Sequence, residues 1–234
     1  MRKLAGLVLL LCATAFAAGQ GVSAPAHVDV RLHLALPAQE KSVPPPAVAW
    51  LKPLTPDTAL RFPPHKPYTL LQKNRTFTPH LLVVPMGSQV LFPNEDPFYH
   101  NVFSLFNGKR FDLGLYEAGS TRTVTFSREG VSYIFCNIHP EMSAVVIALS
   151  TPLYAVASPA AAFLIRNVPE GEYELHVWVE GVPQSDLDHL ARRVHVTAAR
   201  TDLGSIPISN LPVRTTGHLN KFGQPYDRDT KPPY

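Results

Sequence analysis

Four residues with metal-binding side chains stand out by their spacing, and three of them lie in one short stretch. Cys136, His139 and Met142 follow one another with the spacing C-x2-H-x2-M, and His100 lies upstream at the start of a predicted strand. Two imidazoles, a thiolate and a weak thioether form a trigonal site with a long axial bond, which suits copper cycling between two oxidation states. The sequence therefore predicts a metal site formed by His100, Cys136, His139 and Met142.

The beginning of the chain has the pattern of a signal peptide. Two basic residues precede an apolar run over residues 4–18, and Ala15-Phe16-Ala17 is a small-x-small cleavage pattern. The run is too short to span a bilayer. We expect a signal peptide over residues 1–18, with a cleavage site as late as residue 24. The alternative is an uncleaved membrane anchor, and no other stretch is long enough to span a membrane.

Export would change how the two cysteines of the chain are interpreted. Cleavage would remove Cys12 and leave Cys136 as a lone thiol in an oxidising compartment, where bound metal would keep it occupied. The alternative is a buried apolar cysteine that only packs.

The chain has 21 basic and 18 acidic residues. Cleavage removes two basic ones, so the charges nearly balance and give no reason to expect nucleic-acid binding.

The elements around the site are predicted to be short strands. The chain contains 24 prolines, which interrupt helices, so we expect an all-β fold. Runs of strand-forming residues alternate with turn signals in the middle of the chain, as in a β-sandwich. These runs cover residues 81–84, 89–92, 102–105, 121–126, 131–135 and 144–149.

Two further segments predict a second β module that is split in the sequence. Residues 28–36 and 47–51 form strand-like runs too few to fold alone, and more strands are expected after residue 151. The predicted division is 26–66 for the first strands and a proline-rich linker, 68–150 for the sandwich, and 151–212 for the rest of the second module. Residues 213–234 are predicted to form a loosely ordered tail.

The middle of the chain resembles the cupredoxins, the small blue copper proteins. The loop from Cys136 to Met142 reads C-N-I-H-P-E-M and is similar to the short C-x-x-H-P-x-M loop of amicyanin, whereas plastocyanin has a longer gap before the methionine. Gly87-x-x-Val90-x-Phe92-x-Asn94 and His100-Asn101-Val102 also fit the family. The resemblance implies a Greek-key β-sandwich with one type 1 copper ion. It further implies that Asn101 braces the ligand loops by hydrogen bonding. Pro140 is expected to stiffen the loop, and Ile138 departs from the proline that amicyanin has there.

The whole chain resembles exported methylamine-utilisation proteins, which join a cupredoxin to a second β module. Residues 163–175 read F-x-I-x-N-V-P-E-G-x-Y-x-L and resemble carboxypeptidase regulatory-like and transthyretin-like modules. We interpret this module as a packing platform.

These patterns favour an electron carrier over an enzyme. We expect a periplasmic bacterial protein that transfers single electrons between protein redox partners and has no catalytic residues. The alternative is a protein that stores, carries or senses copper, and a third hypothesis is an accessory module in which copper is structural. A Cys136–His139 nucleophile pair lacks a third, orienting residue, and a zinc site is disfavoured because methionine is a poor zinc ligand.

Overall fold

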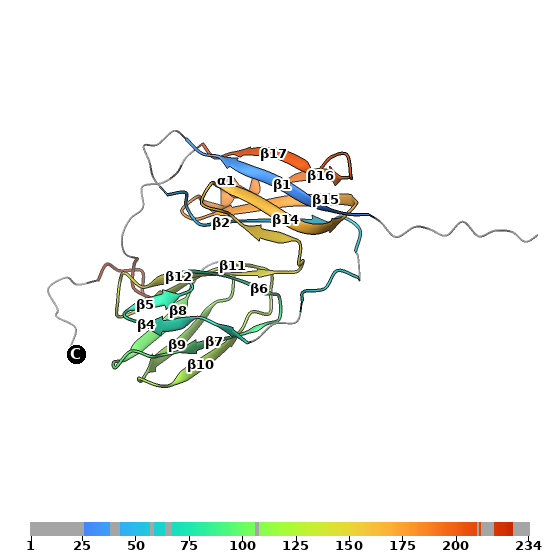
Figure 1. The fold of residues 1–234 in the computed structure, drawn as a ribbon. Helices are drawn as coiled ribbons and strands as arrows, with labels where there is room; N and C mark the ends of the chain where they lie inside the picture. The colour runs from blue at the N-terminus through green and yellow to red at the C-terminus, as the bar shows by residue number, and fades with distance from the viewer. Residues whose placement is uncertain are drawn as a thin grey trace, which may run out of the picture.

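The computed structural model describes residues 26–37, 43–56, 59–63, 67–105, 108–209, 211 and 218–226. Within these ranges the regular secondary structure is β-strand apart from one short helix, α1 (Gln184–Asp188), which confirms the all-β prediction. The predicted signal peptide lies outside the described residues. Figure 1 shows two sandwiches, one above the other, with the chain passing from the upper to the lower and back.

The lower sandwich in Figure 1, here called the central sandwich, is formed by residues 68–149. One sheet has the strand order β6-β12-β11-β8-β9, the other has β10-β7-β3, and the hairpin β4–β5 accompanies them. The strands are β3 (Tyr68–Thr69), β4 (Leu71–Lys73), β5 (Thr76–Thr78), β6 (Leu81–Pro85), β7 (Gln89–Pro93), β8 (His100–Ser104), β9 (Phe111–Tyr116), β10 (Thr121–Thr125), β11 (Gly130–Cys136) and β12 (Ser143–Leu149). Alternate residues of these strands face inward and form its core, including Val90, Phe92 and Ile134.

The upper sandwich, here called the outer sandwich, combines segments from both sides of the central one. Its sheets have the orders β14-β1-β17 and β13-β2-β15-β16. The strands are β1 (His27–Ala35), β2 (Ala47–Pro53), β13 (Tyr154–Val156), β14 (Ala162–Pro169), β15 (Gly171–Val179), β16 (Arg192–Val196) and β17 (Asp202–Pro207). Strand β2 pairs with β13 and β15, and β1 pairs with β14 and β17, so strands from before and after the central sandwich share both sheets.

The strands that lead into and out of the predicted ligand loop are buried on both faces. Ala144, Val146 and Ala148 of β12 face the core of the central sandwich. Val145, Ile147 and Leu149 alternate with them and pack into the core of the outer sandwich. Such a run of apolar residues is typical of a strand covered on both sides. The outer sandwich therefore packs directly on the sheet that carries the site.

The strand predictions match the structure in the central region, but two features differ. Strands β3, β4, β5 and β9 were not predicted: the first three are only two or three residues long, and in β9 Asp112 and Gly114 interrupt the alternation. The tail was expected to be loosely ordered, yet residues 218–226 make hydrogen bonds to the central sandwich. Main-chain and aromatic contacts of this kind leave no periodic pattern in a sequence. Residues 227–234 lie outside the described part.

Candidate metal centre

The strand pairing brings the predicted ligands to one end of the central sandwich. Strand β11 ends at Cys136, which is paired with Val102 of β8, and β8 begins at His100. The loop after Cys136 is tight because the Met142 N–H donates to the His139 carbonyl at 3.0 Å and the Cys136 N–H donates to the Met142 carbonyl at 3.3 Å. These bonds place His139 beside the cysteine that precedes it.

Three potential ligand atoms converge at this end. The Sγ of Cys136 lies 3.5 Å from Nδ1 of His100 and 3.6 Å from Nδ1 of His139. All three ligand atoms lie within 4.8 Å of one another. The side chains are buried, with exposed fractions of 0% for His100 and Cys136 and 5% for His139. This is the one such group of histidine, cysteine and acidic residues found among the described residues.

The separations between the atoms match a shared metal ion. Metal bonds of about 2.0–2.1 Å to histidine nitrogen and about 2.3 Å to thiolate are typical of zinc sites. With angles between tetrahedral and trigonal, such bonds place nitrogen and sulfur about 3.5–3.8 Å apart. The distances from Cys136 Sγ to the two histidine Nδ1 atoms are in or near this range. The residues present therefore fit a small transition-metal ion, which each would bind through the atom already facing the centre.

Asp96 fixes the orientation of His100, a role that was not predicted from the sequence. The Nε2–H of His100 donates to Oδ2 of Asp96 at 2.9 Å, which leaves the Nδ1 lone pair facing Cys136. Metal-binding histidines commonly donate their second N–H to a carboxylate or carbonyl in this way. The one signal in the sequence is a carboxylate four residues before the histidine.

The hairpin β4–β5 holds Asp96 in turn. Its two turn residues, Asn74 and Arg75, both have φ of 55°, as a two-residue type I′ turn requires. Their N–H groups donate to Asp96 at 2.6 and 3.0 Å. Burial acts to raise the pKa of Asp96, but the hydrogen bonds from Arg75, His100 and Asn74 outweigh it and lower that pKa. The carboxylate is therefore ionised at neutral pH.

Burial also sets the protonation of the three ligand side chains. It lowers the pKa of His100, against the opposing effect of Asp96, and lowers the pKa of His139, where His100 adds to the effect. Burial raises the pKa of the Cys136 thiol, although N–H groups of Asn101, Ile138 and His139 oppose this. At neutral pH the metal-free site thus has neutral imidazoles, ready to bind, and a protonated thiol.

The remaining predicted residues lie in the ligand loop or contact it. Met142 is 1% exposed and packs in the core of the central sandwich. The side chain of Asn101 donates to Asp112 at 2.6 Å, whereas its main-chain carbonyl accepts from the N–H of Asn137 at 2.8 Å. The contact between Asn101 and the ligand loop is therefore made by its backbone. Pro140 lies in the loop, with its carbonyl accepting from the N–H of His218 at 3.2 Å.

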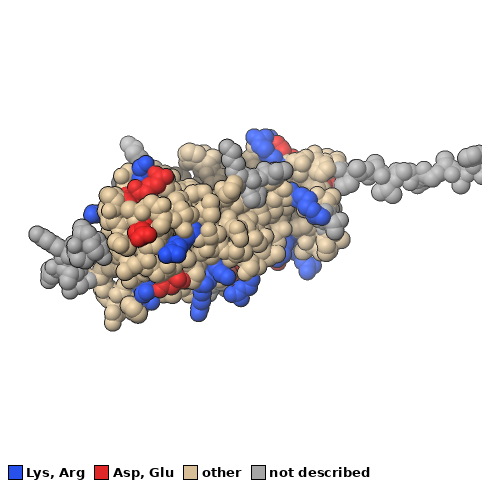
Figure 2. Space-filling view, turned by 90° about the horizontal axis from the view of Figure 1, so that it is seen from below, with Lys and Arg blue, Asp and Glu red and all other residues tan. Residues whose placement is uncertain are grey.

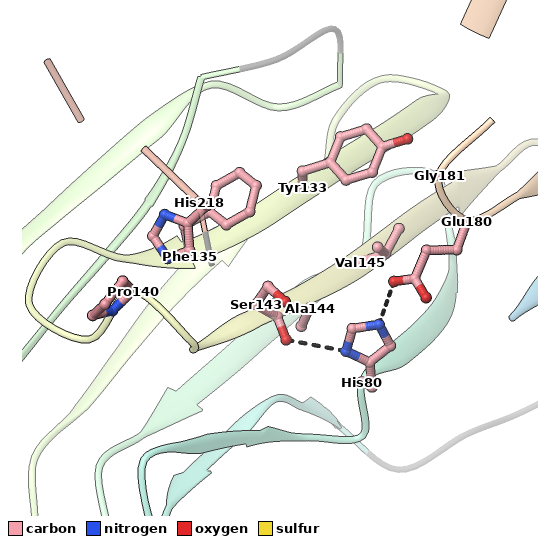
Figure 3. Close-up of a pocket in the computed structure, with 10 residues that line it drawn as sticks. All are labelled: His80, Tyr133, Phe135, Pro140, Ser143, Ala144, Val145, Glu180, Gly181 and His218. Atoms are coloured by element: carbon pink, nitrogen blue, oxygen red, sulfur yellow. Dashed lines mark hydrogen bonds and ion pairs between the residues drawn. The ribbon is translucent and has the colours of Figure 1, made fainter. Parts of the chain in front are cut away.

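A pocket lies behind the ligand loop, between the two sandwiches (Figure 3). Pro140 and His218 lie at one end and His80 and Glu180 at the other. His80 contacts the Ser143 carbonyl through Nδ1 at 3.1 Å and Glu180 through Nε2 at 2.5 Å. These bonds connect the residue after Met142 to the outer sandwich. The other lining residues are Tyr133, Phe135, Ala144, Val145 and Gly181.

On the face shown in Figure 2, basic and acidic side chains are interspersed among uncharged ones. None of the described helices is long and apolar enough to cross a membrane.

Comparisons with known proteins give matches to solved structures only. No protein-family model matches the chain, and no curated protein matches it. A copper-containing nitrite reductase from Thermus scotoductus SA-01 is 25% identical over 36% of this chain and 22% of that chain, with a TM-score of 0.34. The match thus spans under a quarter of the reductase's length.

Two smaller proteins match the same share of the chain. A purple cupredoxin from Nitrosopumilus maritimus is 24% identical over 35% of this chain and 99% of that chain, with a TM-score of 0.32. A reduced mutant of amicyanin is 19% identical over 36% of this chain and 82% of that chain, with a TM-score of 0.34. Since these TM-scores are below 0.5, the functional interpretation rests on the side-chain geometry.

Proposed function

We propose that the chain is an exported copper protein that carries single electrons between protein partners in the bacterial periplasm. His100, Cys136 and His139 bind one copper ion, and Met142 is its weak axial ligand. We also propose that residues 68–150 form the copper domain and that residues 26–66 and 151–212 form a second, split domain.

The observation that carries this proposal is the convergence of two Nδ1 atoms on Cys136 Sγ, with His100 already oriented by Asp96. Bound copper supplies one-electron redox chemistry. The protein residues hold its ligands in place, exclude water and keep the His100 tautomer fixed. Because the metal-free side chains already face one point, little rearrangement is needed on binding.

Burial favours this function over nucleophilic catalysis. Cys136 is fully buried, so no substrate reaches its sulfur, and burial raises its pKa, whereas a nucleophilic thiol needs a lowered pKa. A copper ligand does not have to be reached by a substrate. It does not need a low pKa in the metal-free state either, because the metal displaces the proton.

The same burial argues for an electron carrier over a copper carrier. A protein that passes copper on must expose ligands to its partner, but the three side chains that face the centre are at most 5% exposed. His139 is the most accessible of the three, and the ring of Phe98 lies 5.5 Å from its ring, centre to centre. We propose that electrons pass at this edge of His139.

The test is the visible spectrum of the oxidised, copper-loaded protein. We expect one copper per chain and intense thiolate-to-copper absorption. Cys136→Ser should abolish that absorption, because a hydroxyl replaces the thiolate. A colourless protein that holds Cu(I) tightly would instead indicate copper storage or transport, and selective binding of zinc without copper would refute the copper site.

A further inference from the structure

The described part of the tail, residues 218–226, lies against the back of the ligand loop. It is drawn in red in Figure 1 at the end of the central sandwich where β5 and the start of β12 lie. It follows the last strand of the outer sandwich in the sequence. No motif in the sequence indicated that this segment contacts the site.

Three residues of this tail segment bind three positions of the loop. The hydroxyl of Tyr226 donates to the Cys136 carbonyl at 2.9 Å. The main-chain N–H of Lys221 donates to Oδ1 of Asn137 at 2.8 Å. The N–H of His218 donates to the carbonyl of Pro140. The segment therefore contacts the loop near its beginning and its middle.

Other contacts hold the tail segment in place. The His218 ring lies on Phe135, with ring centres 4.3 Å apart, and closes one end of the pocket in Figure 3. The ring of Tyr226 meets the His218 ring edge-on at 5.4 Å. Lys221 Nζ forms an ion pair with Asp112 at 2.7 Å, and Asp112 also accepts from Asn101, next to His100. The segment thus links the cysteine strand to the strand of the first histidine.

We propose that His218, Lys221 and Tyr226 position the ligand loop, with Tyr226 as the positioning residue that acts through the Cys136 carbonyl. This inference rests on the proposed copper site. A tyrosine hydroxyl is protonated at neutral pH and can donate this hydrogen bond. Its dipole points its positive end at the peptide group of the sulfur ligand. The reduced site holds one more electron than the oxidised site, so its net charge is one unit more negative. The positive end of the hydroxyl dipole therefore stabilises the reduced site more than the oxidised one.

The first experiment uses metal-free protein and compares Tyr226→Phe with the original chain by amide hydrogen exchange. The substitution removes only the hydroxyl, so folding should be preserved. We expect the amides of Asn137 and Met142 to exchange about two- to tenfold faster, the range for one lost hydrogen bond. Phe222→Leu is the matched control: it lies in the same segment, is 73% exposed, and should leave these rates unchanged.

The second experiment measures the copper-loaded protein by redox titration. In Tyr226→Phe the ratio of reduced to oxidised copper at a fixed potential should fall about twofold or more, while the thiolate absorption and the one-to-one stoichiometry remain. A merely structural contact would not change this ratio. Unchanged exchange at Asn137 together with an unchanged ratio would overturn the positioning role. Failure to bind copper in the original chain would refute the copper site, and the exchange result would still decide whether the tail segment restrains the loop.

Discussion

Replacing Asp96 by asparagine should weaken copper binding without removing any ligand. Asp96 is 4% exposed and accepts three hydrogen bonds, from the N–H groups of Asn74 and Arg75 and from Nε2–H of His100. Asparagine has nearly the same shape, but one of its two terminal atoms is a donor. At least one of the three donors must then face an N–H group instead of an oxygen.

The size of the effect follows from the bonds that are lost. If the amide nitrogen faces His100, the ring must shift its proton to Nδ1 to accept from it, and that occupies the lone pair facing Cys136. If the amide is rotated by 180°, its nitrogen faces a backbone N–H of the hairpin, and that N–H loses its acceptor. A hydrogen bond to a charged group is worth about 1.5–3 kcal/mol, and 1.4 kcal/mol is tenfold in binding. We therefore expect copper affinity to fall about 10- to 100-fold.

The assay is competition for copper against a chelator of known affinity. Glu95→Gln is the control, because Glu95 is adjacent and pairs with Lys73 at 3.0 Å, but both side chains are about half exposed. An exposed pair contributes at most about 1 kcal/mol to stability, and this one does not touch a ligand. If Asp96→Asn kept its copper affinity within twofold while remaining folded, the orienting role of Asp96 would be refuted.

Three other changes have defined outcomes. Met142→Leu should raise the reduction potential, because oxidised copper loses more than reduced copper when the sulfur is removed; an unchanged potential in a redox titration would make Met142 a packing residue. Copper binding should release about one proton between pH 7 and 8 and strengthen about tenfold per pH unit, since the raised pKa keeps the Cys136 thiol protonated while the histidines are already neutral. Calorimetry in buffers of different ionisation enthalpy measures this, and no proton release would contradict it. Ile147→Ala should lower the free energy of unfolding by about 2–5 kcal/mol in chemical denaturation, because Ile147 is 1% exposed between the two sandwiches; a loss under about 0.5 kcal/mol would show that this contact does not form.

The sequence predicted the candidate ligands because they lie close together in the chain. Cys136, His139 and Met142 occupy one loop, so their spacing alone brings them near one another. His100 had to be placed by the family resemblance and by its position at a strand start. The pairing of Val102 with Cys136 shows how the strand delivers it. Met142 is buried at the end of the loop, and its role as axial ligand stays a prediction.

The supporting residues could not be predicted in the same way. Asp96 is held by the turn of the β4–β5 hairpin, more than 20 positions earlier, and nothing in the local sequence links the two. Asn101 was expected to brace the ligand loop, but its side chain binds Asp112 on β9, a strand that the broken alternation concealed. Such contacts depend on how distant segments pack.

The double burial of the strands that flank the loop explains why these supporting contacts matter. Loops at the edge of a thin sandwich are free to adjust, but β11 and β12 are covered by the core of the central sandwich on one face and by the outer sandwich on the other. Packed interiors resist small displacements. His80 adds a polar connection from the Ser143 carbonyl to Glu180 of the outer sandwich. At the proposed copper site, a loop held at both ends in this way would keep nearly the same geometry in both oxidation states. Fast electron exchange requires that geometry, whereas release of the metal would require it to open.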